Sequence, residues 1–289
     1  MWPLRRNGLS WRLESIHRQT REVSVRTALA RSRLFDYCVN PYAGCANACV
    51  YCYARFATRF SHPHEEWGSF VDVRANIATV LQRDLSHSRR GTVYMSSVCD
   101  AWQAPEALHG VSRRCLSLLA QSELALFLQT KNALVERDFD LLAGRDHVRI
   151  GVTVTTEDEA VARIFEPGAS APAERLRVLS RARELGLSTF AFLGPLLPGI
   201  SDRGEGLRRL MMTVAEIGPD VLFVDKLNRR TGMWPAVAGA VATLDPALLP
   251  EYRRVLFSAE RLEYEVALRR RVEETASICG LGERIQWCF

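Results

Sequence analysis

The stretch CVNPYAGCANACVYCYARF, residues 38–56, places four of the chain's eight cysteines within fifteen residues. Three of them, Cys45, Cys49 and Cys52, follow the spacing C-x₃-C-x₂-C, and a tyrosine stands on each side of the last one. Three thiolates cannot complete the four-thiolate coordination of a structural zinc site or of an ordinary iron–sulfur cubane. The spacing therefore predicts a metal centre that leaves one coordination position for another ligand.

The composition is that of a globular protein. The chain has 289 residues, of which 47% are hydrophobic and 25% charged, enough for one large α/β domain with small appendages. The net charge of +5 permits a nucleic-acid or phosphate-bearing partner without requiring one. No apolar run approaches the ~18 residues of a membrane span, and no secretory signal is recognisable, so we expect a cytoplasmic protein without a membrane partner. Clustered cysteines in that compartment indicate metal ligands or reactive groups before disulfides.

Short β-branched runs alternate with amphipathic stretches along most of the chain. This alternation predicts a parallel sheet joined by right-handed crossovers, and six strands are too few to close a full barrel. We therefore expect a partial (β/α)6 TIM barrel (34–227), with its chemistry at the carboxyl ends of the strands, between a short N-terminal extension (1–33) and a helical C-terminal extension with a tail (228–289). The predicted strands are 34–40, 92–98, 124–130, 148–156, 188–194 and 221–227, and the predicted helices are 71–88, 105–121, 135–143, 157–165, 173–186 and 203–217.

The cysteine motif, in a loop between the first predicted strand and a helix, resembles the signature of the radical S-adenosylmethionine (SAM) superfamily. The resemblance implies that the three cysteines hold three irons of a [4Fe–4S] cluster and that SAM chelates the fourth; a zinc or redox-sensing site is the alternative. Four segments more narrowly resemble the spore photoproduct lyase-like branch, over about residues 34–227: NPYAGCANACVYCYAR (40–55), QTKNALVERDFDLLA (129–143), VTVTTEDEAVARIFEPGASAPAERL (152–176) and GPLLPGISD (194–202).

The resemblance implies a reaction and its cofactor-binding residues. One electron from the reduced cluster, supplied by a reductant such as flavodoxin or ferredoxin, cleaves SAM, and the 5′-deoxyadenosyl radical takes a hydrogen atom from substrate. Tyr51 then lies against the adenine, and Lys131, one of only two lysines, pairs with the SAM carboxylate. Plain packing of the tyrosine and a solvated lysine at a strand end are the alternatives. The resemblance places four further residues beside the cofactor or its loop, although strand-end hydroxyls also satisfy local backbone groups: Ser96, Ser97, Thr153 and Glu166.

A hydrogen-atom donor is the least secure of the implied roles. Relatives that split lesions carry a cysteine after the second strand, and Cys99 in SSVCDAWQAPE lies in the matching segment, with Tyr53 as a second member of a relay. A hydrogen-atom donor must be a neutral thiol, and both burial and the adjacent Asp100 raise a thiol's pKa. The alternative is a cysteine packed at the end of a strand.

Three classes of function follow from these patterns. The first is a nucleic-acid lesion lyase, in which Arg229 and Arg230 contact phosphates. The second is a radical SAM enzyme acting on a nucleoside or another small molecule in a biosynthetic pathway. The third is a non-enzymatic iron–sulfur or zinc module. The histidine-containing stretch SHPHEEW (61–67) is expected to be a solvated loop.

Overall fold

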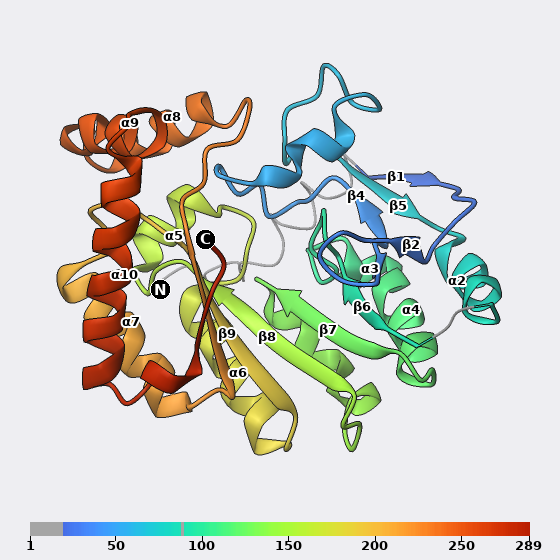
Figure 1. Ribbon diagram of the computed structural model, residues 1–289. Coiled ribbons are helices and arrows are strands. Elements are labelled where there is room, and N and C mark those ends of the chain that lie inside the picture. Colours follow the sequence, from blue (N-terminus) through green and yellow to red (C-terminus); the bar gives the residue numbers. More distant parts are fainter. Residues whose placement is uncertain (1–19, 88–89) are drawn as a thin grey trace, which may run out of the picture.

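The computed structural model describes residues 20–87 and 90–289, which form two sheets surrounded by helices (Figure 1). The larger sheet has eight strands in the order β11-β10-β9-β8-β7-β6-β3-β2, and the smaller has three in the order β1-β5-β4. Every neighbouring pair in the larger sheet is parallel except β2 with β3. Because β11 and β2 end the strand order without pairing with each other, the larger sheet is a curved, open barrel, as predicted.

The six predicted barrel strands are all present in this sheet. They are β3 (Tyr37–Val39), β6 (Thr92–Met95), β7 (Ala125–Thr130), β8 (Val148–Val154), β9 (Ser188–Leu196) and β10 (Val221–Lys226). Two edge strands were not predicted, β2 (Ala30–Arg31) and β11 (Ile285–Trp287). Both are too short to show a hydrophobic period, and only their pairing with β3 and β10 makes them strands.

Helices cross over between the parallel strands and cover the outside of the sheet (Figure 1). One predicted helix, 135–143, is instead a 3₁₀ segment, η2 (Ala133–Leu141). The crossover helices are α2 (Ile77–Leu85), α3 (Glu106–His109), α4 (Val111–Ala120), α5 (Glu159–Phe165), α6 (Pro172–Glu184) and α7 (Gly204–Ile217). The C-terminal part contains α8 (Trp234–Leu244), η3 (Pro246–Leu248), α9 (Leu249–Phe257), α10 (Arg261–Ile278) and η4 (Gly282–Arg284).

The start of the helix predicted at 71–88 was wrong. Residues Val71–Arg74 form β5, which pairs in parallel with β1 (Thr20–Val23) and antiparallel with β4 (Tyr42–Ala43). Valines at positions 71 and 73 suit a strand, and the partners that decide the matter come from distant parts of the sequence. The helix begins only at Ile77.

The expectation of a solvated loop at 61–67 was wrong for His62. Its ring is buried and stacks on Phe70, with 3.8 Å between ring centroids. Its Nε2 lies 2.7 Å from Asp72 Oδ2, and its Nδ1 bonds to Glu65. His62 therefore anchors this loop to β5, whereas His64 is exposed.

The interior of the barrel is apolar and partly aromatic. Phe127 and Phe190 stack with 4.3 Å between ring centroids, and Phe223 meets Phe190 edge to face. This aromatic cluster supports the floor of the site described next.

No helix in the described part of the chain is long and apolar enough to span a bilayer.

Candidate active site

A cavity of about 920 Å³ occupies the open barrel. Its wall near the carboxyl ends of the strands includes Lys131 after β7 and Thr153 in β8, together with four residues of the cysteine loop: Cys49, Tyr51, Cys52 and Tyr53. Phe127, Phe192 and Phe223 line it further inside. The cavity therefore combines an apolar floor with polar groups at one end, as ligand-binding cavities usually do.

The cysteine loop is folded by two tight turns that bring the thiols to one place. Ala48 N donates to Cys45 O at 3.2 Å, and Cys52 N donates to Cys49 O at 3.1 Å. A close contact with the turn after α5 supports the loop, because a Cβ at Gly168 would lie 1.9 Å from the carbonyl oxygen of Ala46. Only glycine permits this approach.

The three thiols of the motif are free and form a buried group. Cys45 and Cys49 are each 6% exposed, and Cys52 is partly buried. Burial raises the pKa of Cys49 to about 12 and also raises the pKa of Cys45 and Cys52, with neighbouring thiolates adding to the effect at Cys45 and Cys49. Ligand binding by such thiols must displace their protons.

This donor set fits an iron–sulfur cluster better than a single ion. In the described residues no three His, Cys, Asp or Glu side chains converge on one metal position. A cubane binds each cysteine through a different iron, so its ligands surround the cluster and need not meet at one point. Three free thiols, two of which line the cavity, therefore fit a [4Fe–4S] cluster that would leave one iron for another ligand.

Lys131 and Tyr51 face each other next to these thiols. The Lys131 ammonium lies 5.7 Å from the centre of the Tyr51 ring and makes no hydrogen bond or ion pair with the rest of the described chain. Burial by itself lowers the pKa of Lys131, but Cys49 and Glu166 outweigh it and raise that pKa above its usual value. The lysine is therefore a permanent cation that an anionic ligand in the cavity can approach.

Glu166 lies behind this pair and does not line the cavity. It accepts hydrogen bonds from the Tyr51 hydroxyl and from Thr155 Oγ1, the latter at 2.8 Å. Arg175 Nη1 lies 2.6 Å from Glu166 Oε2, and both side chains are about 1% exposed. Arg175 and Lys131 hold the pKa of the Glu166 carboxyl below its usual value, although burial alone raises it. Arg175 was missed by the sequence analysis, because an arginine on an amphipathic helix gives no signal of burial.

Asp100 connects the cysteine loop to the end of β7 and was not predicted as a site residue. Its Oδ2 accepts from the backbone N–H of Lys131 at 2.8 Å and from Asn47 Nδ2 at 3.1 Å. Its Oδ1 accepts from Thr130 Oγ1 at 2.7 Å and from the backbone N–H of Trp102 at 2.9 Å. One buried carboxylate therefore sets the position of Lys131 relative to the cysteine loop.

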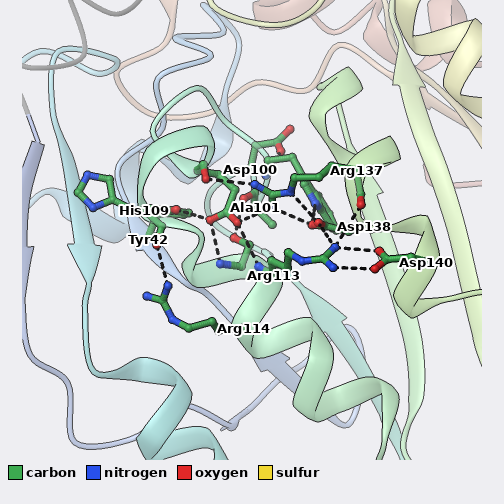
Figure 2. Close-up of polar contacts among 12 residues, drawn as sticks. Tyr42, Asp100, Ala101, His109, Arg113, Arg114, Arg137, Asp138 and Asp140 are labelled. Carbon is green, nitrogen blue, oxygen red and sulfur yellow. Dashed lines mark hydrogen bonds and ion pairs between the residues drawn. The ribbon is translucent and has the colours of Figure 1, made fainter.

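A second polar network supports the segment that follows Asp100 (Figure 2). Arg137 Nη2 donates to Glu106 Oε1 at 2.8 Å, and its Nε donates to Asp138 Oδ1 at 2.7 Å. Arg113 reaches both Asp138 and Asp140. Glu106 and Asp138 are fully buried, so each needs its arginine partners to offset desolvation.

Of the remaining predicted residues, some line the cavity and others do not. Tyr53 lines the cavity, and its hydroxyl donates to the carbonyl oxygen of Ser97. Ser96, Ser97 and Cys99 lie behind the wall and do not line the cavity. The Cys99 thiol lies 3.8 Å from Asn40 Oδ1, and burial raises its pKa to about 11, so it is neutral at pH 7. Ser96 is buried with a φ of +73°, an uncommon conformation for a residue other than glycine.

The opposite wall of the cavity comes from β10 and β11. Asp225 lines it, and burial raises the pKa of this carboxyl to about 6. Gln286 and Cys288 of the tail line it as well, because β11 pairs in parallel with β10. Lys226 also reaches the cavity, but its ammonium is paired with Glu265 of α10. The last residues of the chain are thus part of the site, which neither motif nor composition indicated.

Comparison with known sequences identifies a family and several relatives. A family model for the radical SAM superfamily matches residues 39–211. The uncharacterized protein Rv2578c of Mycobacterium tuberculosis is 30% identical over 265 residues, which cover 87% of this chain and 78% of that protein. The uncharacterized protein ORF301 of Acidianus two-tailed virus is 30% identical over 205 residues, covering 67% of this chain and 68% of that protein.

Solved structures share the fold at low sequence identity. A variant of spore photoproduct lyase with bound AdoMet and dinucleoside spore photoproduct superposes with a TM-score of 0.65 at 17% identity. The match covers 89% of this chain and 79% of that one. Spore photoproduct lyase complexed with dinucleoside spore photoproduct gives a TM-score of 0.63 at 18% identity with the same coverage.

Proposed function

We propose that this chain, which belongs to the radical SAM superfamily, abstracts a hydrogen atom from a substrate held in the barrel cavity, in the manner of a photoproduct lyase. Members of this superfamily are enzymes that use a [4Fe–4S] cluster and SAM, so the non-enzymatic alternative is set aside. When bound, these cofactors supply a 5′-deoxyadenosyl radical by one-electron cleavage of SAM. The protein's own contribution is to bind, orient and shield.

The observation that carries the proposal is the meeting of the cysteine loop and Lys131 at one cavity. Cys45, Cys49 and Cys52 would hold three irons, and the ammonium of Lys131 would pair with the SAM carboxylate as a point charge. Two of the thiols and the lysine line the same space, so a ligand bound to the open iron lies within reach of the cation.

Other residues of the site would orient SAM. Tyr51 would lie against the adenine, with its hydroxyl fixed by Glu166 and thereby by Arg175. Thr153 lines the cavity and accepts a hydrogen bond from Gln129 Nε2 at 2.9 Å, so its hydroxyl has a defined direction. Ser96 and Ser97 would act through the loop that ends β6 rather than by touching the cofactor.

A role in returning a hydrogen atom is proposed for Cys99 and Tyr53. The neutral state of the Cys99 thiol suits a donor of hydrogen atoms. Tyr53 faces the cavity, and its hydroxyl bonds to the residue two positions before Cys99. A relay would therefore run from Cys99 through Tyr53 to the substrate.

Two substrate classes are supported by different walls of the cavity. A lesion in nucleic acid is favoured by the likeness to the photoproduct-lyase branch and by Arg229 and Arg230, two exposed cations after β10 that would contact phosphates. A nucleoside or another small molecule is favoured by the tail, because Gln286 and Cys288 close one side of the cavity. An electron donor is required in either case.

The test is anaerobic reconstitution with iron and sulfide, followed by reduction in the presence of SAM and measurement of 5′-deoxyadenosine. Formation of this product is expected, and its absence with a fully reduced cluster would refute the proposed function. Supplying a dinucleoside photoproduct or a panel of free nucleosides then separates the two substrate classes. If only one of these substrates is consumed together with the formation of 5′-deoxyadenosine, that substrate identifies the class.

A further inference from the structure

A group of exposed residues lies beside the cysteine loop, and in the described chain its ring contacts are only local, Phe56 with Tyr53 and Arg59 with Phe60. The 3₁₀ segment η1 (Tyr53–Thr58) begins immediately after Cys52. The η1 patch, defined as Phe56, Ala57, Arg59 and Phe60, contains two of the most exposed aromatic side chains, with Phe56 54% and Phe60 85% exposed. Exposed aromatic groups beside an arginine are typical of protein interfaces rather than of free surface.

The patch is physically connected to the ligand loop. Arg55 of η1 donates through Nη2 to the carbonyl oxygen of Val50 at 3.1 Å, and Val50 lies between Cys49 and Cys52. The loop and η1 therefore form one continuous unit. None of the four patch residues lines the cavity, so a substrate held there does not cover them.

The patch carries an uncompensated positive charge. Arg59 stacks on the Phe60 ring at 4.6 Å from its centroid and forms no ion pair within the described residues. Of the two glutamates in the adjoining loop, Glu65 is held by His62 and Arg21, and Glu66 lies close enough to Arg55 to interact with it. Among the described residues nothing supplies a charge complementary to Arg59, so a partner molecule can supply it.

We propose that the η1 patch docks the acidic one-electron carrier that reduces the cluster, a flavodoxin or ferredoxin. This inference rests on the proposed function, because that function requires a cluster held by the cysteine loop. Electron-transfer complexes are small and transient, so two rings and an arginine provide enough surface, and a negative partner is steered by the free arginine. The carrier gives up one electron, and a flavin hydroquinone becomes a semiquinone when it does so. This electron would reduce the cluster from the 2+ to the 1+ state.

The experiment compares a protein donor with a small one. Arg59→Glu and Phe60→Ala are expected to lower the rate of cluster reduction by flavodoxin hydroquinone about tenfold, since interface charges act mainly on association. Reduction by dithionite, which needs no docking surface, should be unchanged. The matched control is Arg270→Glu on α10, at the far edge of the sheet (Figure 1), which should behave as wild type with both donors.

A second readout does not need the cofactors. Binding of oxidised flavodoxin to the cluster-free protein, measured by calorimetry, should weaken in both variants and should weaken with added salt in the wild type. Wild-type rates and affinities in both variants, with ferredoxin as well as flavodoxin, would overturn the proposal. So would a selective loss of single-stranded oligonucleotide binding, which would make the patch a nucleic-acid surface.

The two proposals fail in different ways. A wild-type cluster that flavodoxin reduces but that yields no 5′-deoxyadenosine refutes the proposed function and still allows the rates of Arg59→Glu to be compared. Normal SAM cleavage with a flavodoxin rate insensitive to Arg59 refutes only the docking surface.

Discussion

The Lys131 ammonium lies 5.7 Å from the centre of the Tyr51 ring, and both side chains line the cavity beside Cys49 and Cys52. The cation has no anionic partner on the cavity side, while Tyr51 is fixed from behind by Glu166. The ring, the ammonium and two of the ligand thiols thus border the same cavity.

Replacing Lys131 with alanine should weaken SAM binding about tenfold or more, because a charge-assisted contact is worth about 1.5–3 kcal/mol. Cluster content should stay at the wild-type level, since the proposed contact of the lysine is with SAM and not with iron. Equilibrium binding of SAM and iron analysis measure the two effects. Arg208→Ala on α7 is the control, as its exposed guanidinium pairs with Glu205 outside the cavity; equal SAM affinity in all three proteins would remove Lys131 from the site.

Replacing any one of Cys45, Cys49 or Cys52 with alanine should abolish the brown absorbance of the reconstituted protein and all SAM cleavage. Two thiolates hold a cubane too weakly to retain it. Iron and sulfide analysis gives the answer directly. Cys115→Ala, which changes a buried cysteine of α4 outside the loop, should keep its iron, and iron retained in the three loop variants would rule out this ligand set.

Replacing Asp100 with asparagine should destabilise the fold by about 3 kcal/mol, because an amide cannot accept all four of its hydrogen bonds. SAM affinity should fall with it, as the backbone of Lys131 loses its anchor. Urea unfolding measures the first effect and SAM binding the second. Thr130→Val removes one of the four donors and should cost about 1 kcal/mol; an Asp100→Asn protein as stable as wild type would contradict the role.

Replacing Cys99 with alanine should leave SAM cleavage substantial but lower the yield of correct product and raise that of quenched by-products. The reason is that the thiol is neutral and would return the hydrogen atom after the substrate has reacted. Product analysis by mass spectrometry distinguishes the outcomes. Cys99→Ser keeps the shape of the side chain, but its O–H bond is too strong to donate, so it should resemble alanine. Wild-type products from both variants would return Cys99 to the wall of the barrel.

The free energy of unfolding should fall with rising pH because of His62. Burial lowers the pKa of this imidazole, but hydrogen bonds to Asp72 and Glu65 outweigh burial and raise it above the ordinary 6.5. The group therefore stabilises the fold fully below the unfolded pKa of about 6.5 and loses this contribution as pH rises through the higher folded value. His62→Gln should be less stable than wild type at pH 5.5, with the difference shrinking toward pH 8.5 in urea unfolding. His64→Gln, at an exposed position in the same loop, should show no such trend; a constant difference for His62→Gln would contradict the linkage.

Much of the fold was predictable because its signals are local. Each of the six barrel strands falls in an apolar run long enough to show in the sequence, and strand–helix alternation permits few topologies. The failures fell where local signals are absent. Val71–Arg74 became a strand by pairing with β1 and β4, and β11 became one by pairing with β10.

The same division holds for the candidate site. The ligand motif lies within eight residues, so its spacing alone indicates the cofactor, and Lys131 is marked by its rarity. Arg175 and Asp100 gave no such sign. Their importance lies in being buried against Glu166 and against the end of β7, which depends on packing between distant segments.

The sequence by itself determined the cluster motif, the strand order of the barrel and the family, because each follows from short-range spacing and periodicity along the chain. Only the tertiary structure decided what surrounds the reaction. It brought Gln286 and Cys288 from the end of the chain into the cavity wall and left the η1 patch outside it. Such placements arise from contacts between residues far apart along the chain, such as the pairing of Gln286 with Phe223, and no periodicity along the chain encodes them.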